Sequence, residues 1–96
     1  MVKHIVMFKL KEKNPENMER AVSTLRGLDG EIETLRFLEV GVDFKESERS
    51  HDIVLTTHFD HQEGLAAYAV HPIHLPVIDT MKKLCSSSVV VDFITE

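Results

Sequence analysis

The order of elements in this 96-residue sequence predicts an α+β fold, in which helices cover one face of a four-stranded antiparallel sheet. Four stretches alternate in hydropathy with the period of a β-strand. A helical stripe of apolar residues lies between the first two stretches, and a second helical segment, interrupted by proline, lies between the last two. The resulting order, β-α-β-β-α-β, is the split βαβ or ferredoxin-like arrangement.

The first strand and the first helix have clear boundaries. Residues 2–10 alternate, and one side of this predicted strand carries His4, Val6, Phe8 and Leu10. Asn14 is a favourable N-cap and Pro15 suits the first position of a helix. Apolar residues then recur at helical spacing from Met18 to Leu28, and Gly27 and Gly30 indicate where the helix ends.

The remaining elements follow in the second half of the chain. Residues 35–44 and 52–59 alternate as strands, and residues 62–69 have the composition of a short helix. Pro72 interrupts that helix, and Pro76 is expected to start another, with an apolar stripe formed by Val77, Ile78, Met81 and Leu84. Residues 88–94, centred on three valines, complete the predicted sheet.

Both faces of the predicted sheet carry apolar side chains. The face opposite the helices is expected to hold Ile5, Met7, Val54, Val89, Val91 and Phe93. A sheet with one face in water usually alternates with polar residues, so a second layer is expected here. The same face of another copy supplies it most simply, which predicts a homodimer of the dimeric α+β barrel type. A monomer that tolerates an apolar face is the alternative.

Composition excludes several classes of protein. The length predicts a single domain over residues 1–96. Eleven basic and sixteen acidic residues give a net charge of −5, which disfavours nucleic acid and anionic membranes as partners. Neither a signal peptide nor a membrane-spanning segment is expected from the pattern, and the single cysteine suits a reducing compartment. A cytoplasmic protein is expected.

The segment from Tyr68 to Pro76 concentrates chemistry-bearing side chains. It holds a phenol and the imidazoles of His71 and His74 around a broken helix. Histidine titrates near neutrality and tyrosine donates hydrogen bonds, so Tyr68 and His74 are candidate catalytic residues. His4 is expected on the same side of the sheet. An apolar pocket with polar groups at one end follows, with ligand contacts predicted from His4, Val6, Phe8, Ile53, Leu55 and His71.

Other interpretations of these residues stay open. The histidines and Tyr68 can simply serve the fold, through turn capping and ring packing. The His-x-x-His spacings at 58–61 and 71–74 permit a metal site, but no ligand set of fixed geometry is in register, so no metal and no cofactor is expected. Cys85 shows no sign of a nucleophile. Asp92, inside a strand, needs a partner, for which Lys3 or Lys9 is expected.

Three motifs together resemble the stress-responsive α/β-barrel (Dabb) domain family. They are the opening segment Lys3–Lys9, the stretch Tyr68-x-x-His71-Pro72-x-His74, and the closing segment Val90–Phe93. The motifs lie in the family's order and the resemblance covers essentially the whole chain. It implies a dimeric α+β barrel.

The resemblance also implies possible activities. Most members of the family have no assigned activity, and plant members are associated with stress responses. One branch contains polyketide cyclases, which close a linear polyketide by aldol-type condensation without a cofactor. By resemblance to that branch, His74 is a general base, Tyr68 donates a hydrogen bond to the enolate oxygen, and His4 lines the pocket. The pattern departs from the cyclases at Ile53, where they have a further pocket histidine.

Three functions follow from these observations. The first is a homodimer that binds a small, partly apolar molecule in a His/Tyr-tipped pocket. The second is a cofactor-independent enzyme, cyclase-like or isomerase-like, that transfers protons through His74 and Tyr68. The third is a structural dimerisation module, in which replacement of Tyr68 or His74 lowers the stability of the fold and no ligand is bound.

Overall fold

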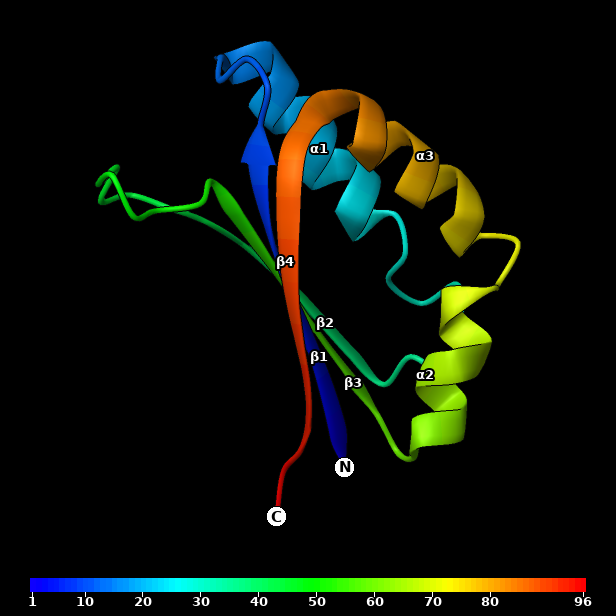
Figure 1. Ribbon diagram of the computed structural model, residues 1–96. Helices are drawn as coiled ribbons and strands as arrows, with labels where there is room; N and C mark the ends of the chain where they lie inside the picture. The colour runs from blue at the N-terminus through cyan, green and yellow to red at the C-terminus, as the bar shows by residue number, and fades with distance from the viewer.

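The computed structural model describes residues 1–96 as one sheet flanked by three helices (Figure 1). The elements are, in order, β1 (Val2–Leu10), α1 (Pro15–Arg26), β2 (Phe37–Val42), β3 (Ile53–Phe59), α2 (Gln62–Ala69), α3 (His74–Leu84) and β4 (Cys85–Ile94). The strand order is β2-β3-β1-β4, and every neighbouring pair is antiparallel. The predicted ferredoxin-like α+β fold is confirmed.

Most element boundaries agree with the hydropathy pattern, and the differences have local causes. Helix α3 begins at His74, two residues before Pro76, because the first turn of a helix has no intrahelical partner for its N–H groups and so tolerates proline. Strand β4 begins at Cys85, since its serines pair with β1 through the backbone. Strand β2 is shorter than predicted, although Arg36 N–H still donates to the His58 carbonyl just before it.

The start of α1 follows from its cap. The Asn14 side chain accepts a hydrogen bond from Asn17 N–H at 2.8 Å, and Pro15 occupies the first turn. The helix ends at Gly27, whose N–H donates to the Ser23 carbonyl. These caps set the ends of α1, and the fully buried Ala21 and Leu25 pack the helix into the core against the sheet.

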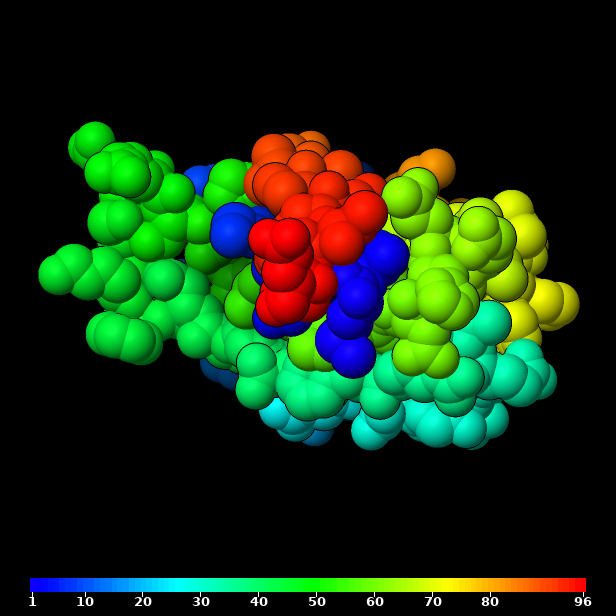
Figure 2. Space-filling view, turned by 90° about the horizontal axis from the view of Figure 1, so that it is seen from below, coloured from blue at the N-terminus to red at the C-terminus, as the bar shows by residue number.

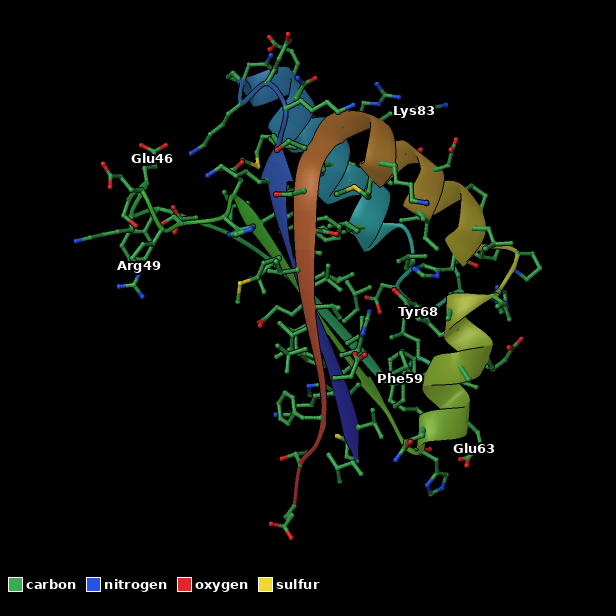
Figure 3. The ribbon with its side chains drawn as sticks, viewed as in Figure 1. Glu46, Arg49, Phe59, Glu63, Tyr68 and Lys83 are labelled. Atoms are coloured by element: carbon green, nitrogen blue, oxygen red, sulfur yellow. The ribbon has the colours of Figure 1, made fainter.

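The core lies between the sheet and the helices and consists of two apolar clusters that share contacts with Leu38 and Val77. The larger cluster contains Phe8, Leu10, Ala21, Leu25, Ile53, Leu55, Met81 and Leu84. The smaller one contains Val2, Leu28, Ile32, Phe59 and Tyr68. Tyr68 therefore reaches from α2 into the core beside Phe59, as Figure 3 shows.

The other face of the sheet has no helix over it (Figure 1). Its exposed apolar side chains include Met7, Phe37, Val89, Val91 and Phe93. The pairing register places Val91 beside Ile5 and Val89 beside Met7, so these side chains form one surface across β1 and β4. We call this surface the open face. The structure thus confirms that both faces of the sheet are apolar.

The two ends of the chain meet at the lower edge of the sheet, where Thr95 N–H donates to the Met1 carbonyl. The blue N-terminal and red C-terminal segments lie side by side in Figure 2. None of the helices has the length and apolarity needed to cross a membrane.

Candidate functional site

The break between α2 and α3 brings the candidate catalytic residues together. Pro72 separates the two helices, and the turn is held by hydrogen bonds from His71 N–H to the Tyr68 carbonyl and from His74 N–H to the His71 carbonyl. The His71 ring also accepts a hydrogen bond from Ile73 N–H through Nδ1 at 3.1 Å. This geometry folds the start of α3 back toward the end of α2.

Three rings meet at this break. The rings of Tyr68 and His74 stack, with their centroids 4.1 Å apart and 29° between their planes. The His4 ring, from β1, lies edge-on to Tyr68 at 6.0 Å. Phe59 packs against the same tyrosine at 5.1 Å. The sequence-based grouping of His4, Tyr68 and His74 is therefore reproduced in space.

The Tyr68 hydroxyl is buried and has no hydrogen-bond partner within the protein. The residue as a whole is 1% exposed. Burial raises the pKa of Tyr68 to about 12, because the phenolate loses its hydration there. The phenol keeps its proton at neutral pH and is available as a hydrogen-bond donor.

His74 is held in one tautomer. Its Nδ1 lies 3.3 Å from the Ala69 carbonyl, and since a carbonyl only accepts, Nδ1 carries the hydrogen. The other ring nitrogen, Nε2, then carries the lone pair. Burial lowers the pKa of His74, and the nearby His4 and His71 rings lower it further, against the opposing effect of the Ala69 and Tyr68 backbone. The neutral, proton-accepting form is favoured.

Asp92 pairs with His4, not with Lys3 or Lys9. The carboxylate accepts a hydrogen bond from His4 Nδ1. The register explains the correction: Asp92 lies directly opposite His4 on the helix-covered side of the sheet, whereas Lys3 and Lys9 alternate to the open face. This pairing orients the His4 ring beside Tyr68.

A cavity of about 440 Å³ opens beside these rings, between the sheet and the helices. It is lined by His4, Val6, Phe8, Leu25, Leu55, Tyr68, His74, Val77, Ile78, Met81, Lys82, Cys85, Ser86, Ser87 and Ser88. Its volume falls within the range of small-molecule sites, roughly 300–1,000 Å³. Polar groups lie at its ends and apolar side chains lie between them.

The cavity contains most of the residues predicted to form the site, namely His4, Val6, Phe8, Leu55, Tyr68 and His74. Ile53 and His71 are not in its lining. Ile53 is 2% exposed and belongs to the core cluster. His71 caps the turn before α3, with its Nε2 3.9 Å from Glu33.

One face of α3 lines the cavity, whereas the apolar stripe in the sequence predicts only a core-facing helix there. The lining residues of α3 follow helical spacing, so they share one side of the helix. They are His74, Val77, Ile78, Met81 and Lys82. The sequence contains a signal for this lining, because residues three, four, seven or eight positions after His74 share its face of the helix. Cys85 continues the lining, and burial together with the Asp52 carboxylate raises the pKa of its thiol, which disfavours the nucleophilic thiolate.

The arrangement can bind a small apolar molecule and can polarise a carbonyl group on it. Tyr68 is a protonated donor, and His74 is a neutral base beside it. A donor for an oxygen and an acceptor for a proton are the groups that enolisation needs. No three His, Cys, Asp or Glu side chains lie close enough together to hold a metal ion.

Fold and site together define a ferredoxin-like α+β domain with an apolar, His/Tyr-tipped cavity between its sheet and its helices. The chain belongs to the stress-responsive A/B barrel (Dabb) domain family, which it matches over residues 2–95. The resemblance seen in the three sequence motifs is thereby confirmed.

Two known proteins are similar to this chain over most of its length. An uncharacterised protein of Streptomyces coelicolor is 30% identical over 77 residues, which cover 77% of this chain and 79% of the relative. A dimeric protein of unknown function from Bacteroides fragilis, with a ferredoxin-like fold, is 28% identical. Its crystal structure matches 98% of this chain and 95% of its own with a TM-score of 0.82.

The same fold also occurs in an enzyme. A hydroxynitrile lyase from Passiflora edulis matches 99% of this chain and 93% of its own, with a TM-score of 0.86 and 14% identity. At this identity the likeness shows a shared fold and nothing about activity.

The lowered pKa of His74 predicts how stability depends on pH. The unfolded chain has the ordinary histidine pKa of 6.5, so below that value it binds more protons at His74 than the folded chain does. The stability that this difference contributes is complete above pH 6.5 and is lost as the pH falls through and below it. His58, whose pKa burial also lowers, acts in the same direction.

Urea unfolding between pH 5 and pH 8 measures this effect. We expect wild-type stability to fall on acidification and His74→Gln to show a shallower fall, with His61→Gln, at the exposed cap of α2, behaving as wild type. Equal slopes in wild type and His74→Gln contradict the assignment.

Proposed function

We propose that this chain is a homodimer that binds a small, partly apolar molecule in the cavity between its sheet and its helices. The observation that carries the proposal is the Tyr68 hydroxyl, a buried donor without a protein partner in a residue that lines the cavity. A buried hydroxyl left unpaired costs about 1–3 kcal/mol, and a ligand oxygen removes that cost. The imidazoles of His4 and His74 supply further polar contacts beside it.

The remaining contacts are apolar. Val6, Phe8 and Leu55 form the sheet wall of the cavity, and α3 forms the opposite wall. Ile53 supports the sheet wall from the core, and His71 supports the turn that carries His74. Both residues therefore act on the ligand through their neighbours.

A second candidate function is proton transfer on a carbonyl compound without a cofactor. It is favoured by the opposite protonation tendencies of two stacked rings, since burial keeps Tyr68 protonated and His74 neutral. In this reaction His74 Nε2 takes a proton from the carbon next to the carbonyl, and Tyr68 donates a hydrogen bond to the enolate oxygen. The chemistry is cyclase-like or isomerase-like, and a lyase with this fold exists in Passiflora edulis.

Binding is tested with octan-2-one, a neutral molecule with an apolar chain and one carbonyl. We expect saturable shifts in the NMR spectrum of the protein, and about two- to tenfold weaker binding to Tyr68→Phe, the equivalent of one hydrogen bond. The same variant should be at least as stable as wild type, because it removes an unpaired buried hydroxyl.

The stability measurement separates this function from a structural role. Marked destabilisation of Tyr68→Phe together with unchanged ketone affinity contradicts the proposal and favours a dimerisation module. His61→Gln is the matched control, since His61 is exposed and lies outside the cavity.

The dimer is tested by native mass spectrometry. We expect wild type at twice the chain mass and Val91→Lys as a monomer, because the substitution places a charge in an apolar interface on the open face. Val70→Lys is the control: Val70 is 70% exposed against 63% for Val91, and it lies at the end of α2 on the helix side. A wild-type monomer, or a Val91→Lys dimer as stable as the control, refutes the interface.

Proton transfer is tested by deuterium exchange into octan-2-one in heavy water, followed by NMR. If the second function holds, the protein accelerates exchange at the carbons beside the carbonyl, and His74→Gln abolishes the acceleration while ketone binding persists. Exchange at the wild-type rate in His74→Gln removes His74 as the base.

A further inference from the structure

The polar groups of the cavity are divided between two ends. On β1, His4 lies at one end and Phe8, four residues further on, at the other, a separation of about 13 Å. On α3, His74 and Lys82 are separated by eight residues, about 12 Å along the helix. One end therefore holds the rings of His4, Tyr68 and His74. The other end holds Lys82 and the serines at the start of β4, with only apolar walls and Cys85 between the two ends.

Lys82 is a cation without an acidic partner. Its neighbour Lys83 pairs with Asp79 at 3.2 Å, and Lys13 pairs with Glu46 at 2.9 Å, but no carboxylate lies within ion-pair distance of Lys82. The lining of the cavity contains no Asp or Glu, and Asp52, whose carboxylate acts on Cys85, lies outside the lining and is paired with Lys13 at 3.6 Å and with Leu10 N–H. In a chain of net charge −5, a wall without carboxylates that includes a lysine favours an anion at that end.

Hydroxyl donors accompany the lysine. Ser88 lies opposite Phe8 in the β1–β4 register, so its side chain points to the helix-covered side and toward the cavity. Its hydroxyl makes no hydrogen bond within the protein, whereas the Ser86 hydroxyl donates to the Lys9 carbonyl. Lys82 and Ser88 thus offer a charged and a neutral donor at the same end of the cavity.

From this arrangement we infer that the ligand is an elongated amphipathic acid. Its anionic group lies against Lys82 and Ser88, its apolar chain lies along Val6, Phe8 and α3, and its far end carries an oxygen that accepts from Tyr68. The inference rests on the proposed function of this cavity as a binding site, and it adds the charge and the orientation of the ligand.

A purely structural role for Lys82 makes a different prediction. Lys82 and Lys83 both lie in the last turn of α3, where a cation interacts favourably with the negative end of the helix dipole. Lys83 shares that role but does not line the cavity, and Figure 3 shows it at the outer end of α3. Lys83→Gln is therefore the matched control for Lys82→Gln.

The experiment compares the affinities of octanoate, 1-octanol and 8-hydroxyoctanoate by isothermal titration calorimetry at pH 7.5. We expect octanoate to bind about three- to fivefold more tightly than 1-octanol, the effect of one solvent-accessible ion pair, and the difference to shrink in 0.5 M salt. Lys82→Gln should abolish the difference, and Lys83→Gln should preserve it. 8-Hydroxyoctanoate should bind more tightly than octanoate to wild type but not to Tyr68→Phe.

Equal binding of 8-hydroxyoctanoate and octanoate to wild type overturns the placement of the ligand's far oxygen at Tyr68. Equal binding of octanoate and 1-octanol, or equal losses in Lys82→Gln and Lys83→Gln, overturns the acidic ligand while leaving the cavity as a binding site. If octan-2-one and all three of these compounds fail to bind, both the inference and the proposed function are overturned.

Discussion

The site depends on the interruption of one helix. A continuous helix over residues 62–84 would place Tyr68 and His74, six positions apart, on different faces, because helical neighbours are three or four positions apart. Pro72 prevents that continuation, and the freed backbone groups are satisfied within the turn by Tyr68, His71 and His74. The turn between α2 and α3 (Figure 1) lets the two rings stack at 4.1 Å. The Pro72 turn is therefore the constraint from which the geometry of the candidate site follows.

Burial then leaves one of the two stacked rings as a proton donor and the other as a proton acceptor. The same loss of hydration disfavours the phenolate of Tyr68 and the imidazolium of His74, because both are charged forms. The result is a donor and an acceptor side by side, both neutral. His4 differs from them, since Asp92 offers its ring a carboxylate partner. The site thus combines two neutral groups with one that has an acidic neighbour.

The sequence predicts the fold well because the fold depends on periodicity and on caps. The alternation of β1 and the Asn14-Pro15 start of α1 are local signals, and the structure reproduces both. The proximity of His4 to Tyr68 was predicted from the face of β1 alone. Register is a non-local property, and this is why the sequence alone predicts Lys3 or Lys9, and not His4, as the partner of Asp92.

The composition of the cavity was harder to predict than its polar end. Ile53 shares a sheet face with Leu55, and both are almost fully buried, yet only Leu55 lines the cavity. The helices decide which part of a sheet face stays uncovered, and their placement depends on the packing of Leu25 and Met81, which alternation does not report. Lys82 is hard to predict as a lining residue for the same reason. Whether its side chain lines the cavity depends on which side of α3 faces the cavity.

The open face and the cavity are connected through β1 and β4. Alternate residues of β1 serve the two sides: His4, Val6 and Phe8 line the cavity, while Ile5 and Met7 belong to the open face. Strand β4 is an edge strand that is exposed along almost its whole length, although it carries Asp92 and Ser88. A partner copy on the open face would cover Val89, Val91 and Phe93 and so restrain this strand. In the proposed dimer, the interface therefore holds in place the strand that orients His4 and forms the polar end of the cavity near Lys82.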